Sequence, residues 1–170
     1  MCLDSFKKVK CHKGSVATVH MMSDNVDTHL ICTGGTFDGS LVVHDMRSNQ
    51  PVFSKQLHQG ALNKVLGNMS GLIITCSADK TCAIIDPQSG FKEIGRLKCS
   101  DAAFTMVTAW NYTAVGCGDG NLLVFNNDTQ ECLYGFGAMS KGAVHAMKVS
   151  DDFTKLVVCG DDPTSLLINF

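Results

Sequence analysis

The sequence lacks the features that mark most secreted, membrane-spanning and nucleic-acid-binding chains. None of its apolar runs approaches the roughly 20 residues of a membrane helix, and residues 1–8 contain no apolar core of the kind found in signal peptides. Charged residues make up only 18% of the 170 residues, and the net charge is −2, so no basic surface is offered to nucleic acid. We expect no membrane insertion, no nucleic acid partner and a cytoplasmic or other reducing intracellular location.

The sequence also lacks the cysteine and glycine spacings of metal and phosphate sites. Nine cysteines include no Cys-x-x-Cys pair, and the glycine-rich segment 116–120 contains no Gly-Lys-Ser/Thr. Four cysteines, Cys32, Cys76, Cys117 and Cys159, recur 44, 41 and 42 residues apart, each shortly before a polar turn. We interpret them as reduced, buried thiols that pack as small apolar side chains. The sequence therefore predicts no metal and no cofactor.

Sustained 3.6-residue periodicity is absent, and short β-rich runs are separated by Gly, Asp, Asn and Ser, which favours an all-β fold. One pattern repeats four times: an Asp in a turn lies seven residues before an Asp or Asn that closes the next strand. The pairs are Asp38 and Asp45, Asp79 and Asp86, Asp119 and Asn126, and Asp162 and Asn169. The turn aspartates are 41, 40 and 43 residues apart, a period typical of propeller blades with four antiparallel strands.

This repeat divides a single domain, residues 1–170, into about four blades. We expect the blades at roughly 11–56, 57–97, 98–139 and 140–170, with an extra leading strand at 5–10. The expected count is sixteen strands: one leading strand, three sets of four, and a final set of three.

The repeats resemble those of WD-repeat β-propellers over nearly the whole chain. Such repeats carry a His before the innermost strand, matched by His12 and His58, and an Asp in the turn between the second and third strands. Ser100 and Ser140 stand where the third and fourth repeats would have the His. The resemblance implies that these residues, with a Thr on the second strand, hold the blade together by hydrogen bonds. The network it implies contains His12, Asp38, His58, Thr75, Asp79, Asp119 and Asp162.

The segment from Leu41 to Arg47 is also similar to the Trp-Asp-x-Arg box of WD-repeat substrate receptors that dock on cullin-type ubiquitin ligases, with His44 in the place of Trp. That resemblance implies that Asp45 and Arg47 contact the ligase adaptor. It gives an alternative function, the substrate-receptor subunit of such a ligase.

A second alternative is an enzyme that uses the propeller channel, which would need a carboxylate within hydrogen-bond reach of His20 or His145. The expected inner strands themselves contain no carboxylate, so we predict no catalytic residues. The function that we expect is a non-enzymatic scaffold that binds other proteins within a larger assembly.

Propellers have four to eight blades, so the four blades expected here are the smallest number that forms a closed ring. In the WD-repeat family the N-terminal strand completes the last blade, which here would pair residues 6–10 with 165–170. We expect an incomplete ring completed by another chain or by a second copy. A self-closed four-blade ring and a fragment of a longer protein are the alternatives.

Overall fold

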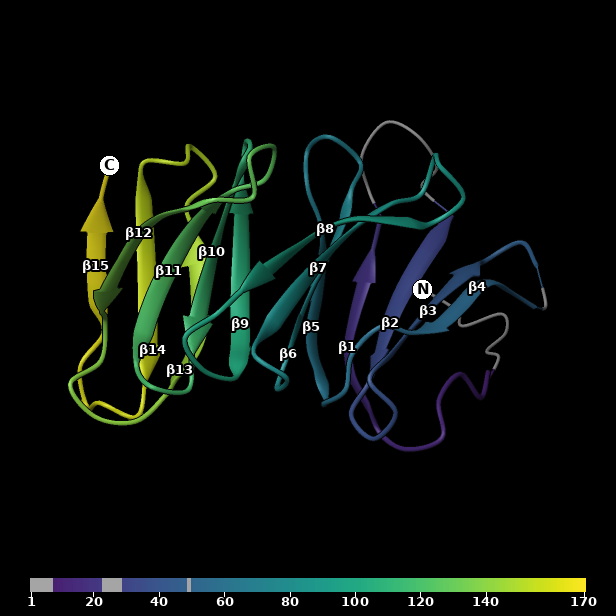
Figure 1. Ribbon diagram of the computed structural model, residues 1–170, viewed down its shortest axis with the longest axis horizontal. Coiled ribbons are helices and arrows are strands. Elements are labelled where there is room, and N and C mark those ends of the chain that lie inside the picture. Colours follow the sequence, from purple (N-terminus) through teal and green to yellow (C-terminus); the bar gives the residue numbers. More distant parts are fainter. Residues whose placement is uncertain (1–7, 23–28, 49) are drawn as a thin grey trace, which may run out of the picture.

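A computed structural model describes residues 8–22, 29–48 and 50–170, and shows four antiparallel sheets placed side by side (Figure 1). Blade 1 contains β1 (Val16–Met21), β2 (Leu30–Gly35), β3 (Ser40–Asp45) and β4 (Pro51–Gln56). Blade 2 contains β5 (Leu62–Gly67), β6 (Ile73–Ser77), β7 (Thr81–Asp86) and β8 (Lys92–Lys98). Blade 3 contains β9 (Ala103–Ala109), β10 (Tyr112–Cys117), β11 (Asn121–Asn126) and β12 (Cys132–Gly137). Blade 4 contains β13 (Val144–Val149), β14 (Lys155–Gly160) and β15 (Leu166–Asn169).

Each blade is a meander, in which every strand pairs with the next strand along the chain. The first strands of neighbouring blades contact one another in the order β1, β5, β9, β13. Polar side chains join these inner strands: Thr18 of β1 accepts a hydrogen bond from the Val65 backbone N–H at 3.2 Å, and Asn63 donates to the Ala103 carbonyl at 2.8 Å. The sequence-based fold class, all-β with four-stranded antiparallel blades, is confirmed.

The apolar core lies between the blades, in three clusters. One cluster joins blades 1 and 2 and includes Val43 and Ile73, and a second joins blades 2 and 3 and includes Ile84 and Phe125. The third joins blades 3 and 4 around Leu156. Strands in the middle of a blade therefore bury side chains on both faces, which explains why β6 and β7 read as nearly continuous apolar runs instead of alternating ones.

The tight turns between second and third strands depend on the backbone conformation of one residue. Gly39, Lys80 and Gly120, each directly after a turn aspartate, have φ values of 58°, 68° and 82°. Glycine adopts this left-handed region without steric cost, whereas Lys80 has a Cβ atom and adopts it at a cost in conformational energy.

The N-terminal strand predicted at residues 5–10 is not found where the structure describes it: residues 8–10 belong to no strand, and residues 5–7 lie outside the described part. The predicted pairing of this segment with residues 165–170 is likewise not seen for residues 8–10, because β15 pairs with β14 alone. Figure 1 shows blade 1 and blade 4 at opposite ends of the long axis. The described residues thus give fifteen strands, and they do not show a closed ring.

Candidate functional site

The most elaborate polar cluster lies in blade 2, where His58 connects the start of the blade to its central turn. His58 is 1% exposed and is placed by the short connection between β4 and β5. Its Nδ1 lies 3.0 Å from Oδ2 of Asp79, and its Nε2 lies 2.9 Å from the hydroxyl of Thr75. The three residues that the family resemblance placed in one network are therefore in contact.

The electrostatics of this cluster favour a neutral imidazole. Burial lowers the pKa of His58 below its ordinary value, and it outweighs the opposing effect of the Asp79 carboxylate. Burial alone would raise the pKa of Asp79, but hydrogen bonds from Thr81, from the Gln59 backbone N–H and from His58 lower it overall. A neutral His58 then donates from Nδ1 to an ionised Asp79 and accepts at Nε2 from Thr75.

Sequence reasoning missed two members of this cluster. The hydroxyl of Thr81 lies 2.7 Å from Asp79 and 3.2 Å from His58 Nδ1. Arg96 on β8 donates to the Thr81 hydroxyl at 2.9 Å and to the Leu57 carbonyl at 3.0 Å. The sequence does contain a pattern that could have pointed to the Thr81 hydroxyl, because Ser40 and Thr81 both stand two residues after a turn aspartate.

Blade 1 contains the same arrangement with a shifted pairing. His12 is 7% exposed; its Nδ1 lies 2.8 Å from the Ser40 hydroxyl, and its Nε2 lies 3.0 Å from the Thr33 hydroxyl. Ser40 in turn lies 2.6 Å from Oδ1 of Asp38, whereas His12 and Asp38 approach only to 3.5 Å. The serine therefore stands between the histidine and the aspartate that were expected to pair directly.

Blades 3 and 4 hold their turn aspartates without a histidine. Asp162 accepts hydrogen bonds from the Ser140 backbone N–H at 2.6 Å and from the Ser140 hydroxyl at 2.9 Å, so serine takes the place of the missing His. Asp119 bonds within its own turn, to the backbone and side-chain nitrogens of Asn121 at 3.1 and 2.8 Å. Asp162, the turn aspartate that the repeat spacing predicts, thus contacts the position that matches His58, the partner of Asp79.

Asp45 and Arg47 lie next to each other just after β3. Arg47 donates to Asp45 from its backbone N–H at 2.8 Å and from Nη2 at 2.7 Å, and hydrogen bonds from Arg47 lower the pKa of Asp45 to about 2. The corresponding residues of blades 2 and 3, Asp86 and Asn126, also accept a backbone N–H two residues on, at 2.9 Å in each case. Closing this turn is therefore a property of the position in blades 1, 2 and 3.

One contact that the channel-enzyme alternative required is present. His145 on β13 lies 2.8 Å from Oδ1 of Asp161, and both side chains are about half exposed, at 53% and 50%. The Ala143 backbone N–H also donates to Asp161, and these bonds lower the pKa of the carboxyl. Among the described contacts, no hydroxyl or thiol joins the pair, so a histidine–carboxylate dyad is present without a nucleophile.

Within the described ranges, no three His, Cys, Asp or Glu side chains are grouped so that they could hold a metal ion. The eight cysteines described are free; Cys32, Cys76 and Cys117 are buried, but Cys159 is only partly so, contrary to our expectation. The nearly equal spacing of these cysteines suggested that they occupy the same position in every blade, and this is wrong for Cys32. Cys32 pairs with Val43 across β2 and β3, and the matching pair in blade 2 is Ile74 with Ile84. Cys32 therefore takes the position of Ile74 and not that of Cys76.

No helix that could cross a membrane occurs in the residues that the structure describes.

No family model matches the sequence, and no curated protein matches it either. Solved structures do match: the computationally designed Ika4 protein superimposes with a TM-score of 0.80 at 17% identity, over 95% of each chain. The computationally designed Ika8 protein superimposes with a TM-score of 0.79 at 18% identity, over 94% of this chain and 47% of that one. These likenesses show a β-propeller-like repeat fold, and this chain spans about half the length of Ika8.

Proposed function

We propose that the chain is a WD-repeat-like part-propeller that acts as a non-enzymatic scaffold for other proteins. The observation that carries this proposal is the closed polar network of blades 1 and 2. The His and Thr side chains that could perform chemistry are buried, the Asp side chains are largely covered, and all are bonded to one another, as in the blade-holding network that the family resemblance implies. What remains for function is the surface of the loops at the two ends of the blades, which suits binding of proteins.

The match to about half of Ika8 supports the part-propeller element of this proposal, because the four blades reproduce only part of a longer chain of the same fold. The propeller interior supplies rigidity, and the loops supply recognition.

Co-purification from the native source tests the scaffold function, with two variants that change opposite ends of the blades. Phe37, 82% exposed in the turn between β2 and β3, is replaced by Asp in one variant, and Met46, 59% exposed after β3, is replaced by Asp in the other. We expect a stoichiometric partner that is lost with one variant and kept with the other. Identical loss with both, or turnover of a substrate by the purified chain with no partner, would contradict the proposal.

A second candidate, the substrate-receptor subunit of a cullin-type ubiquitin ligase, rests on Asp45 and Arg47. Their ion pair is at the surface, with the Arg47 side chain 58% exposed. If the adaptor binds there, Arg47→Ala should reduce adaptor binding at least tenfold, while Lys80→Ala, which removes an equally exposed cation at 57%, should not. Equal binding by the two variants would leave Asp45 and Arg47 with the turn-closing role alone.

The channel-enzyme candidate rests on His145 and Asp161. Any activity that depends on this dyad should disappear in both His145→Ala and Asp161→Asn, and should persist in His58→Gln. Screening the purified chain against ester and phosphoester substrates would measure it. We rank this candidate last because the described contacts supply no nucleophile.

A further inference from the structure

Blade 4 is one strand short. Its sheet has the order β13-β14-β15, whereas each of the other three sheets has a fourth, outer strand. β15 pairs with β14 through residues 166–169, and no described residue pairs with its other edge. An unpaired edge presents a row of free N–H and C=O groups to which another strand can add.

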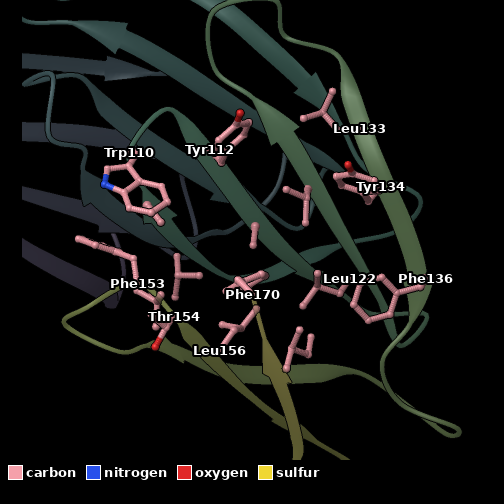
Figure 2. A pocket seen from close by; sticks show the side chains of 16 residues that line it. Trp110, Tyr112, Leu122, Leu133, Tyr134, Phe136, Phe153, Thr154, Leu156 and Phe170 are labelled. Carbon is pink, nitrogen blue, oxygen red and sulfur yellow. The ribbon is translucent and has the colours of Figure 1, made fainter.

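An apolar groove of about 770 Å³ lies beside this edge. Figure 2 shows it between blades 3 and 4: Tyr134 and Phe136 come from the outer strand β12, Leu156 comes from β14, and Phe170 follows β15. Tyr134 and Phe170 are 67% and 75% exposed. The groove is therefore a wedge of apolar surface at the place where an outer strand of blade 4 would lie.

The other two blade junctions show what normally fills this space. Between blades 1 and 2, Phe91, just before the outer strand β8, stacks on Phe53 of β4 with ring centroids 4.8 Å apart. Between blades 2 and 3, Gln130, just before the outer strand β12, donates to the Ile94 carbonyl of β8 at 3.0 Å. At both junctions a residue just before the outer strand of the later blade contacts the outer strand of the earlier blade. The described residues of blade 4 include no outer strand and no residue before one, so none of them makes this contact with β12.

The face of blade 4 that points away from blade 3 is also uncovered. In blade 2 the directly paired residues Ile74 and Ile84 face blade 3, and both are 0% exposed. Val157 and Leu167 form the equivalent pair in blade 4, and they are 43% and 56% exposed. Cys159, equivalent to the fully buried Cys76, is partly exposed on the same face. Blade 4 therefore exposes apolar side chains at positions that are buried against a neighbouring blade in blade 2.

The chain contains a segment, residues 5–10, with the sequence position of an outer strand. The outer strand β4, residues 51–56, ends two residues before His58, and residues 5–10 stand in the same position before His12. In this fold an outer strand leads directly into the inner strand of the next blade, as β4 leads into β5 and β8 into β9. A segment 5–10 that completes blade 4 must therefore bring β1 next to β13. Within one chain these two blades lie at opposite ends of the long axis (Figure 1).

We propose that residues 5–10 of a second copy of this chain add as the fourth strand of blade 4, beside β15. The second copy's blade 1 then packs on Val157 and Leu167, and the first copy's residues 5–10 complete the second copy's blade 4 in the same way. Each copy gives one strand and receives one, so the contact is head-to-tail and closes after two copies into a ring of eight blades. Three copies would already need twelve blades, beyond the usual range of four to eight.

The mass of the 170-residue chain in solution is the first test, measured by light scattering coupled to gel filtration. We expect twice the 18.2 kDa of one chain. Removal of residues 1–10, which leaves His12 in place, should give a monomer, as should Leu167→Asp. Phe37→Asp, which changes a side chain 82% exposed away from the groove, should remain a dimer. Near-UV circular dichroism checks that each variant is folded.

A mixing experiment tests the head-to-tail geometry. The variant without residues 1–10 has an intact blade 4, and Leu167→Asp has an intact N-terminal segment, so an equimolar mixture should form a dimer through one complete interface. A symmetric contact between two identical surfaces would not be restored by mixing. Cys159 provides a site-resolved readout: its thiol should react with a labelling reagent at least tenfold faster in the monomeric variants than in the dimer, while Cys76 stays protected in both.

Three results would overturn the proposal. One is a folded wild-type chain that stays at 18.2 kDa at all concentrations. Another is a dimer that survives deletion of residues 1–10. The third is a mixture of the two variants that stays monomeric although both components are folded. None of these outcomes depends on the scaffold function proposed above.

Discussion

Replacement of His58 by alanine is the sharpest test of the blade network, because this side chain joins three elements of blade 2. The change removes the contacts of Nδ1 with Asp79 at 3.0 Å and of Nε2 with Thr75 at 2.9 Å. A net hydrogen bond contributes about 0.5–1.5 kcal/mol, and a bond to a charged group contributes more. The two bonds together therefore set an expected loss of roughly 1–3 kcal/mol.

The partners left behind keep this loss from being larger. Asp79 retains the backbone N–H of Gln59 at 3.0 Å and the hydroxyl of Thr81 at 2.7 Å, and Thr75 retains a long contact to the Ala83 carbonyl at 3.4 Å. No buried group is wholly orphaned, so we do not expect the 3–5 kcal/mol that follows from an unpaired buried charge.

Chemical denaturation with urea, read by tryptophan fluorescence of Trp110 and by circular dichroism, measures the change. For a chain of this size 1–3 kcal/mol corresponds to a fall of roughly 2–12 °C in Tm. His145→Ala is the matched control, because that side chain is 53% exposed and should change stability by less than about 0.5 kcal/mol. A loss below about 0.3 kcal/mol for His58→Ala would refute the network, as would equal losses for the two variants.

The remaining predictions concern thiols, acid and one strained turn. Under native conditions a thiol reagent should label the exposed Cys132 but not the buried Cys76, as measured by mass spectrometry. Equal labelling rates for the two cysteines would contradict the burial of Cys76. Stability should fall as pH drops below about 6.5, because unfolded His58 takes up a proton more readily than folded His58, whose pKa is lowered. It should fall again at lower pH as Asp79, whose pKa is also lowered, is protonated; the first decline should shrink in His58→Ala. At Lys80, with φ 68°, substitution by Gly should be more stable than by Val by about 1–2 kcal/mol in urea; the reverse order would contradict the strain.

The local chemistry of the blades could be predicted from the sequence because it repeats. A turn Asp and a short β-rich run recur with a period of about forty, and the hydrogen bonds inside such a turn are made within a few residues. The contact of His58 with Asp79 joins residues 21 positions apart, and it was implied by the resemblance to WD repeats and not by the period itself. The insertion of Ser40 between His12 and Asp38 was not predictable, since both oxygens stand near the imidazole and only the folded turn places Nδ1 at 2.8 Å from Ser40 and 3.5 Å from Asp38.

The relation between the two ends of the chain was decided only by the tertiary structure. The sequence pattern shows that residues 5–10 stand in the position of an outer strand and that the last repeat has three strands. Whether they meet within one chain depends on the rotation from each blade to the next, which is set by packing of side chains such as Ile84 and Phe125 between sheets and leaves no periodic signal in the sequence. That packing places blade 1 and blade 4 at opposite ends of the molecule. It leaves Val157 and Leu167 exposed where the same positions in blade 2 are buried.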